Sequence, residues 1–164
     1  MKKTLLLVLI LAIIVQILVP AYMIWEKYNV LKNGDEVKIK VAPIDPYDAF
    51  RGRYVSLWYD DDLSYEERNG KYGILEVDED GFSTVKKVVK EKPEGELYIT
   101  SKEDDYFYIP LDTYYMEETL APKAENMLSE EKEAYVTIRI KDDKSVLSGL
   151  YFDGKPVEEL LSKD

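Results

Sequence analysis

The chain has 164 residues and a formal net charge of −11, and it contains no cysteine and no histidine. These absences exclude disulfide bonds, thiol chemistry, Ser-His-Asp and Cys-His catalysis, and zinc sites built on those ligands. All 33 acidic residues follow Trp25, and such a negative surface disfavours nucleic acid and anionic lipid headgroups as ligands.

Residues 4–25 form a charge-free stretch of mostly Leu, Ile, Val and Ala after the basic end Met1-Lys2-Lys3. As a helix this stretch would be roughly 33 Å long, enough to cross the ~30 Å hydrocarbon core of a bilayer. A cleaved signal peptide has a shorter apolar core and a small-residue cleavage site, so we expect an uncleaved anchor instead. Pro20 lies within the stretch, which the membrane interior tolerates when the freed backbone groups find partners.

The lysines at the amino terminus favour a cytoplasmic start and an outward-facing remainder. We therefore expect a single-pass protein of the cell membrane. The sequence divides into a basic cytoplasmic end at 1–3, a transmembrane helix at 4–25, a juxtamembrane linker at 26–33, and an extracytoplasmic β-rich domain at 34–164.

Short β patterns separated by turn signals follow Gly34. Residues 36–41 alternate apolar and charged side chains, which is typical of a strand with one buried face. Residues 72–77 and 82–89 flank Asp78-Glu79-Asp80-Gly81, whose Asp-Gly ending predicts a hairpin. Further strands are expected at 54–59, 97–100, 106–109, 135–140 and 146–152.

The hydrophobic period changes to that of a helix at Met116, Leu120, Ala124, Met127 and Leu128, which predicts one helical insertion. A short closing helix is expected at 156–161, and Asp60-Asp61-Asp62 is expected to form a solvated turn. The predicted fold is mainly β, an antiparallel barrel- or sandwich-like meander with one short helical insertion, behind a single amino-terminal transmembrane helix.

Residues 43–59 combine two prolines, an arginine, a glycine and a dense aromatic run, and we expect them to form a corner between strands. Arg51 is placed to pair with Asp45 or Asp48 through its planar guanidinium. Such a pair either pins the turn or forms part of a binding surface, and the structural role is the commoner one. The candidate residues of the corner are Asp45, Pro46, Asp48, Arg51, Gly52, Tyr54, Leu57 and Tyr59.

The segment Gly52-Arg53-Tyr54-Val55-Ser56-Leu57-Trp58-Tyr59 resembles the signature of the GDYXXLXY family of membrane-anchored bacterial proteins. The likeness extends to the apolar amino terminus, the strand after Gly34, Tyr-Tyr-x-Glu-Glu at 114–118 and the closing strands that end in Asp153-Gly154. Arg53 stands where the family signature has an aspartate, which argues against a metal ligand or a catalytic acid there. The resemblance implies a companion of multi-pass membrane proteins and no defined chemistry.

No catalytic motif stands out, and we expect no catalytic residue, metal or cofactor. A serine with a lysine base is disfavoured because Ser56 lies among large apolar residues, and the acidic runs lack the ligand spacing of a calcium loop. The 14 tyrosines either fill the core or line a groove for glycan or peptide, and core filling is the commoner use.

Three functions remain open. The preferred one is a noncatalytic accessory domain that binds or stabilises an integral membrane protein while residues 4–25 contact the lipid bilayer. The second is a module that binds cell wall or polysaccharide through exposed tyrosines such as Tyr47 and Tyr106. The third is an enzyme in which Arg51, an aspartate of the corner and a carboxylate of 117–118 converge. The sequence specifies no oligomeric state.

Overall fold

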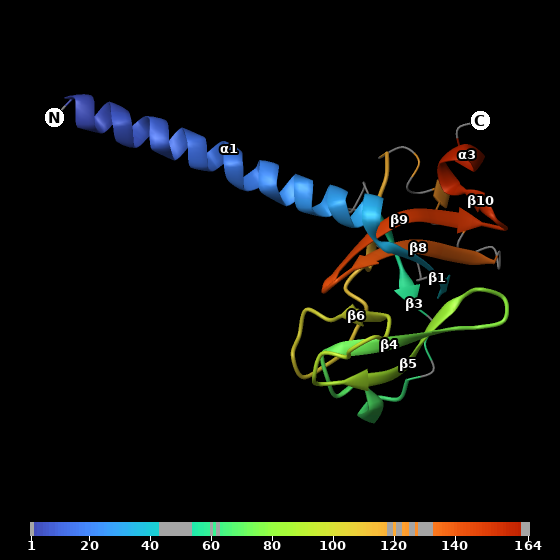
Figure 1. Cartoon of the computed structure of the whole chain (residues 1–164). Coiled ribbons are helices and arrows are strands. Elements are labelled where there is room, and N and C mark those ends of the chain that lie inside the picture. Colours follow the sequence, from blue (N-terminus) through green and yellow to red (C-terminus); the bar gives the residue numbers. More distant parts are fainter. Residues whose placement is uncertain are drawn as a thin grey trace.

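The computed structural model describes residues 2–42, 54–59, 61, 63–117, 120, 123–124, 127 and 133–161. A long helix, α1 (Lys2–Asn33), projects from a β-rich domain (Figure 1). The mainly β fold behind an apolar amino-terminal helix is thereby confirmed.

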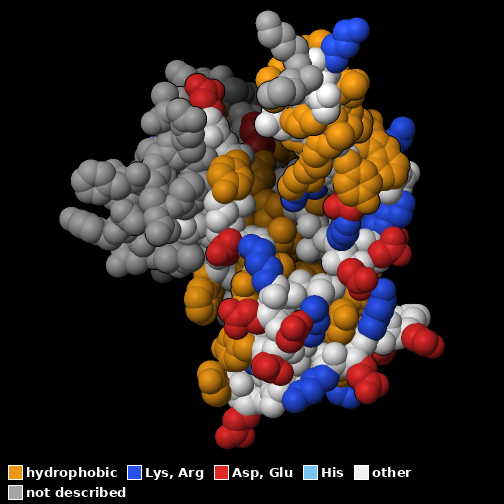
Figure 2. Space-filling model, turned by 90° about the vertical axis from the view of Figure 1, so that its left-hand side faces the viewer, with side chains coloured by type: hydrophobic (Ala, Val, Ile, Leu, Met, Phe, Trp, Pro, Cys, Tyr) orange, Lys and Arg blue, Asp and Glu red, His pale blue; other side chains and the backbone are white. Residues whose placement is uncertain are grey.

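From residue 4 to residue 25, helix α1 is apolar all round, and every side chain of this stretch is exposed. No part of its apolar window is buried, and it is the one helix of the described chain that is long and apolar enough to cross a membrane, a property shared by signal sequences. Figure 2 looks toward its amino-terminal end and shows hydrophobic side chains gathered over it, whereas charges of both signs cover the lower part of the domain. Residues 26–33, predicted as a linker, are the continuation of this helix.

The largest sheet has five antiparallel strands in the order β10-β9-β8-β1-β3. Its members are β1 (Asp35–Ala42), β3 (Trp58–Tyr59), β8 (Ala134–Lys141), β9 (Lys144–Phe152) and β10 (Lys155–Pro156). Because β1 lies between β8 and β3, strands from the two ends of the domain share one sheet. The strands expected at 36–41, 135–140 and 146–152 are confirmed.

Two smaller sheets complete the domain. Strands β4 (Tyr72–Val77), β5 (Ser83–Val89) and β6 (Tyr98–Thr100) form one in the order β5-β4-β6, and β2 (Tyr54–Ser56) pairs with β7 (Thr113–Tyr115) in the other. The predicted hairpin is confirmed, since Asp78 and Gly81 close the β4–β5 turn, and Gly81 adopts a φ of 83° that suits glycine. The strand expected at 97–100 is present as β6.

Two predicted strands are wrong in their extent. Residues 54–59 do not form one strand, because Leu57 separates β2 from β3 and donates its backbone N–H to Asp112 at 2.9 Å. Residues 106–109 form no strand, although Phe107 and Ile109 are buried. Ser101 satisfies the backbone there, accepting from Tyr108 N at 3.4 Å and donating to Tyr106 O at 3.1 Å.

The predicted helical insertion lies largely outside the described residues. Of its members, Ala124 and Met127 are helical, Ala124 is fully buried, and its N–H bonds the Leu120 carbonyl at 3.0 Å. The short closing helix is confirmed as α3 (Val157–Leu161). A single turn of 3-10 helix, η1 (Glu66–Arg68), lies on the side of the domain opposite α1 (Figure 1).

One hydrophobic core joins the three sheets. Its largest fully buried side chains are Phe107, Phe152, Ile99, Ile138, Leu150, Val55, Val136 and Val157. Phe107 lies against Gly73, where an added Cβ would stand 2.2 Å from the ring. The glycine therefore makes room for the aromatic side chain that attaches the 101–110 loop to β4.

Candidate functional site

The predicted corner is described only at its carboxyl-terminal end. Asp45, Pro46, Asp48, Arg51 and Gly52 lie outside the described residues, as does the ion pair expected among them. The enzyme hypothesis depends on Arg51 and the same aspartates, so its convergent site also lies outside that part of the chain. Tyr54, Leu57 and Tyr59 are the remaining candidates.

The described end of the corner packs into the domain. Tyr54 begins β2, the Leu57 side chain is buried in the core, and the Tyr59 hydroxyl donates to the backbone carbonyl of Leu111. Burial raises the pKa of Tyr59, and the nearby Asp112 carboxylate raises it further, so the phenol remains a neutral donor. Leu57 and Tyr59 thus hold the transition between two sheets.

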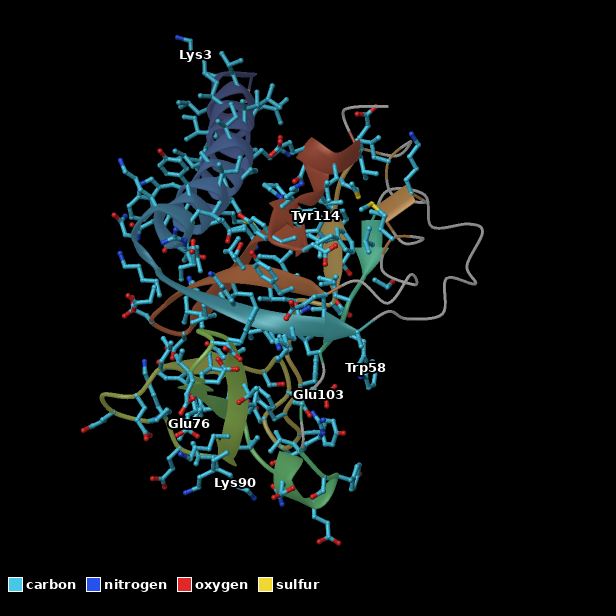
Figure 3. The ribbon with its side chains drawn as sticks, turned by 90° about the vertical axis from the view of Figure 1, so that its right-hand side faces the viewer. Lys3, Trp58, Glu76, Lys90, Glu103 and Tyr114 are labelled. Carbon is cyan, nitrogen blue, oxygen red and sulfur yellow. The ribbon has the colours of Figure 1, made fainter. Side chains whose placement is uncertain are left out.

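Trp58 stands between these two inward-facing residues and points the other way. It is 62% exposed on β3, the edge strand of the five-stranded sheet. Figure 3 shows it projecting away from the ribbon below β1. An exposed tryptophan offers a large contact area with a donor at its rim, a side chain enriched at protein interfaces.

The end of α1 is fastened to the β8–β9 hairpin, and we call this region the junction. Glu26 forms an ion pair with Lys144, Lys141 Nζ donates to Asn29 Oδ1 at 3.3 Å, and the Val30 side chain is buried. The contact with Lys144 lowers the pKa of Glu26, which favours the charged pair. The helix therefore meets the sheet through side chains along one flank.

Backbone contacts complete the junction at Gly34. Its N–H donates to the Val30 carbonyl at 2.8 Å, and its own carbonyl accepts from Arg139 at 3.1 Å. A Cβ at this position would stand 2.6 Å from Val30 O and 2.8 Å from Ile140 O, both backbone atoms. Only glycine fits where the helix turns directly into β1.

A cleft of about 440 Å³ lies beside the junction, between the end of α1, the 100–102 and 110–111 segments and the start of β9. Charged side chains of both signs line it, namely Glu26, Lys27, Lys102, Asp143 and Lys144. Asp143 accepts from Lys92 at 3.0 Å and from the Tyr98 hydroxyl at 2.9 Å, and these donors lower its pKa. Its acidic groups are thus already engaged in structural pairs.

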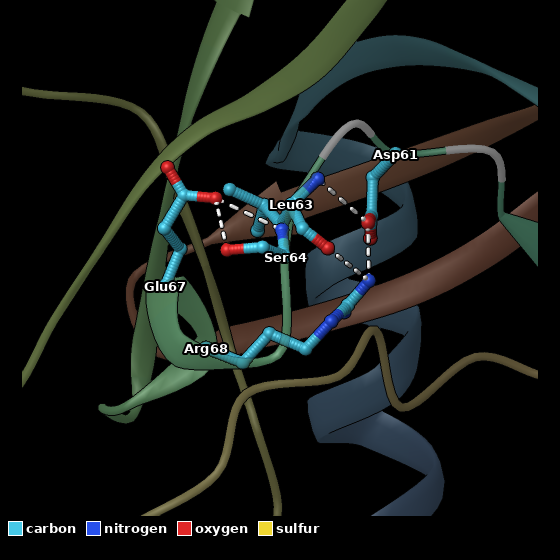
Figure 4. Close-up of polar contacts among 5 residues, drawn as sticks. All are labelled: Asp61, Leu63, Ser64, Glu67 and Arg68. Carbon is cyan, nitrogen blue, oxygen red and sulfur yellow. Dashed lines mark hydrogen bonds and ion pairs between the residues drawn. The ribbon is translucent and has the colours of Figure 1, made fainter.

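A second polar cluster lies at the opposite side of the domain, which we call the tip (Figure 4). Arg68 of η1 binds the Asp61 carboxylate, and Asp61 also accepts from Leu63 N at 3.4 Å. The Asp61 side chain is only 7% exposed. The expectation of a solvated turn is therefore wrong at Asp61. Its partner, Arg68, lies seven residues later and could not be recognised from a run of aspartates.

The tip also carries a pair of aromatic rings. The Tyr65 and Tyr106 rings lie 5.5 Å apart, and Tyr65 is 79% exposed. Most other described tyrosines of the domain pack against neighbours, as when Tyr135 stacks on Tyr151 at 5.0 Å and Tyr114 binds Glu158 beside α3 (Figure 3). Tyr47, proposed as a wall contact, lies outside the described residues.

Metal ligands do not gather in the part of the chain that the structure describes. Within it, no three acidic residues are arranged so that they could hold a metal ion. The perturbed carboxylates found there, Glu26, Glu67 and Asp143, owe their lowered pKa to structural hydrogen bonds from Lys144, Ser64 and Lys92 respectively.

Comparison with known proteins gives one match. The model of a family described as GDYXXLXY protein matches residues 16–150, from the middle of α1 to β9. The description names a sequence signature and no activity. No curated protein and no solved structure shows significant similarity to the chain.

Proposed function

We propose a function for this chain, which belongs to the family of GDYXXLXY proteins: it is a noncatalytic accessory protein, anchored in the membrane by α1, whose extracytoplasmic domain binds or stabilises an integral membrane protein. The observation that carries the proposal is the junction, which fixes the domain to its anchor. Three features of the molecule support it in turn.

The first feature is the surface of α1. The apolar side chains of residues 4–25 face outward all round and are not covered by the domain, an arrangement that suits a helix in contact with lipid better than a helix in water. Lys2 and Lys3 precede the apolar stretch and favour a cytoplasmic amino terminus. On this basis α1 is retained as a single-pass anchor and the domain lies outside.

The second feature is the continuity of α1 with the domain. A domain that needs only to be kept near the membrane can be tethered to its anchor by a flexible linker. Here the helix reaches Asn33 without interruption, and Glu26, Asn29 and Val30 are tied to the hairpin. The domain would thus present one defined face beside the bilayer, which suits a partner that is itself embedded there.

The third feature is the chemistry of the described residues. Their perturbed acidic groups serve structural contacts, and the two acidic side chains that line the cleft at the junction, Glu26 and Asp143, are both paired with lysines. By contrast, Trp58 is a large exposed aromatic side chain on a sheet edge, the type of residue that dominates binding energy at interfaces. A binding role is favoured over catalysis.

The test is crosslinking in intact cells followed by mild-detergent purification of the full-length protein. One variant replaces residues 4–25 with an unrelated transmembrane helix of equal length, and a second inserts a flexible Gly-Ser segment between Trp25 and Glu26. We expect a stoichiometric integral membrane partner that survives the helix replacement and is reduced by the flexible insertion. Recovery of the protein alone would overturn the proposal.

The second candidate function is binding of cell-wall polymer, and the tip favours it. The exposed Tyr65 and the half-buried Tyr106 form a ring pair beside η1, on the side of the domain away from α1, where an extended glycan could stack. Isolated wall material should retain the parent protein and release a Tyr65→Ala, Tyr106→Ala variant. Trp58→Ala serves as the matched exposed-aromatic control and should still bind.

A further inference from the structure

One polar side chain interrupts the apolar part of α1. Between Leu5 and Ala21, Gln16 is the only residue whose side chain can form hydrogen bonds. It lies about 2 Å along the helix from the middle of the 4–25 stretch, which puts it near the centre of the hydrocarbon core. Gln16 is exposed and forms no hydrogen bond with another side chain in the described part of the chain.

Pro20 adds a second unsatisfied group at the same place. In an α-helix the carbonyl of residue 16 accepts from the N–H of residue 20, and proline has no N–H. Residues four apart lie on the same face of a helix. The amide of Gln16 and the backbone carbonyl freed by Pro20 therefore form one polar spot on one face of an otherwise apolar helix.

A hydrocarbon environment leaves these groups without water, so partners must come from protein. The domain cannot supply them, because Gln16 lies about 25 Å along the helix from Asn33. Figure 1 shows that this part of α1 stands clear of the sheets. Another transmembrane helix can supply the complementary groups.

We propose that this helix is α1 of a second copy of the chain, paired in parallel through the face that carries Ala12, Gln16 and Pro20. The inference rests on the proposed membrane anchor and adds to it that the anchored unit is a dimer.

Self-pairing satisfies every group at the polar spot. Copies of one chain insert with the same orientation and depth, so Gln16 of one meets Gln16 of the other. A primary amide has two donors and an acceptor, so each Gln16 can donate to the amide oxygen and to the freed carbonyl of its neighbour. Ala12, one turn earlier, is small enough for close approach. Repulsion between the acidic domains is screened beyond about 8 Å at physiological salt.

The chain contains no cysteine, so single cysteines can report the contact in the full-length protein in its native membrane. Leu9 lies two turns before Gln16 on the same face, whereas Leu11 lies on the opposite face. Leu9→Cys should form a disulfide-linked dimer under mild oxidation, and Leu11→Cys is the matched control that should form severalfold less.

The polar spot itself is tested in the Leu9→Cys protein. Gln16→Leu should reduce dimerisation about three- to tenfold, the range expected for losing interhelical hydrogen bonds. Pro20→Ala restores the missing N–H and should reduce dimerisation by less than Gln16→Leu does. Gln16→Asn should retain most of the dimerisation. Energy transfer between two differently tagged copies, measured at matched expression, gives the association constant of each variant.

Alkaline carbonate extraction of the same membranes separates the two proposals. If the protein is extracted, α1 is no anchor and both proposals fail. If it remains and Leu9→Cys links no better than Leu11→Cys, the dimer is overturned while the accessory function stands. If a thiol-reactive crosslinker joins Leu9→Cys to a different protein, the face binds that partner and the second copy is excluded.

Discussion

The junction and the tip are both held by ion pairs, but the pairs sit in different surroundings. At the junction, the side chains of Lys144 and Glu26 are 50% and 29% exposed, and the tight fit of Gly34 supplies the geometry. At the tip, Asp61 is nearly enclosed and depends on Arg68. Burial therefore decides what an ion pair contributes. The exposed pair at the junction mainly orients two elements, whereas the buried pair at the tip stabilises a loop.

The largest effect is expected at the tip. Arg68→Ala leaves the Asp61 carboxylate buried without its cation, so the free energy of unfolding should fall by about 3–5 kcal/mol. Denaturant titration of the detergent-solubilised full-length protein measures it. Lys86→Ala removes an exposed ion pair with Glu76 and is the matched control, which should cost far less. Equal losses in the two variants would mean that burial does not decide how much an ion pair contributes to stability.

Gly34→Ala tests the junction through its backbone. The added methyl would meet two carbonyl oxygens that cannot rotate away, and overpacking of this kind costs about 1–3 kcal/mol. The loss of stability should be accompanied by weaker attachment of α1 to the domain, which is measured as faster amide hydrogen exchange at Val30 and the residues around it. Asn33→Ala, next to it, removes only an exposed contact with Asn29 and should leave exchange unchanged.

Tyr59 of β3 makes the free energy of unfolding depend on pH. Its folded pKa is raised above the ordinary value of 10, so its contribution is complete below pH 10 and declines as the pH rises further. The slope expected is about 1.4 kcal/mol per pH unit. Tyr59→Phe should cost about 1 kcal/mol at pH 7 through the lost bond to Leu111, and its alkaline decline should be shallower.

The smallest effect is expected for Glu26→Gln. The folded pKa of Glu26 is lowered below its ordinary value of 4.5, so its contribution is present above that pH and vanishes as the pH falls through the lower folded value. The melting temperatures of variant and parent should differ slightly at pH 7 and converge as the pH falls below 4.5. A difference that persists in acid would mean that the carboxylate is not what binds Lys144.

The elements that could be predicted from the sequence are those with strong local patterns. Strand β1 alternates cleanly, the β4–β5 turn ends in Asp-Gly, and α1 has a long apolar run. The local sequence determines these elements, because the spacing of apolar residues fixes which side chains are buried, whatever other elements pack against them.

The failures share a different cause, which is a contact that the local sequence pattern does not reveal. Leu57 breaks its strand to bond Asp112, and Asp61 is enclosed because η1 turns Arg68 toward it. Residues 26–33, the expected juxtamembrane linker, are helical and contact β8 and β9. Of the candidate site, the inward orientation of Tyr59 could not be recognised because its hydroxyl partner is the Leu111 carbonyl, 52 residues away.

The direct passage from α1 into β1 has a mechanical consequence. A transmembrane helix tilts when its apolar length exceeds the local bilayer thickness. Because α1 ends at Asn33 and β1 begins at Asp35, no flexible segment absorbs that rotation, and the five-stranded sheet turns with the helix. With α1 as the proposed membrane anchor, the thickness of the surrounding lipid would therefore set the height and angle of Trp58 relative to the bilayer.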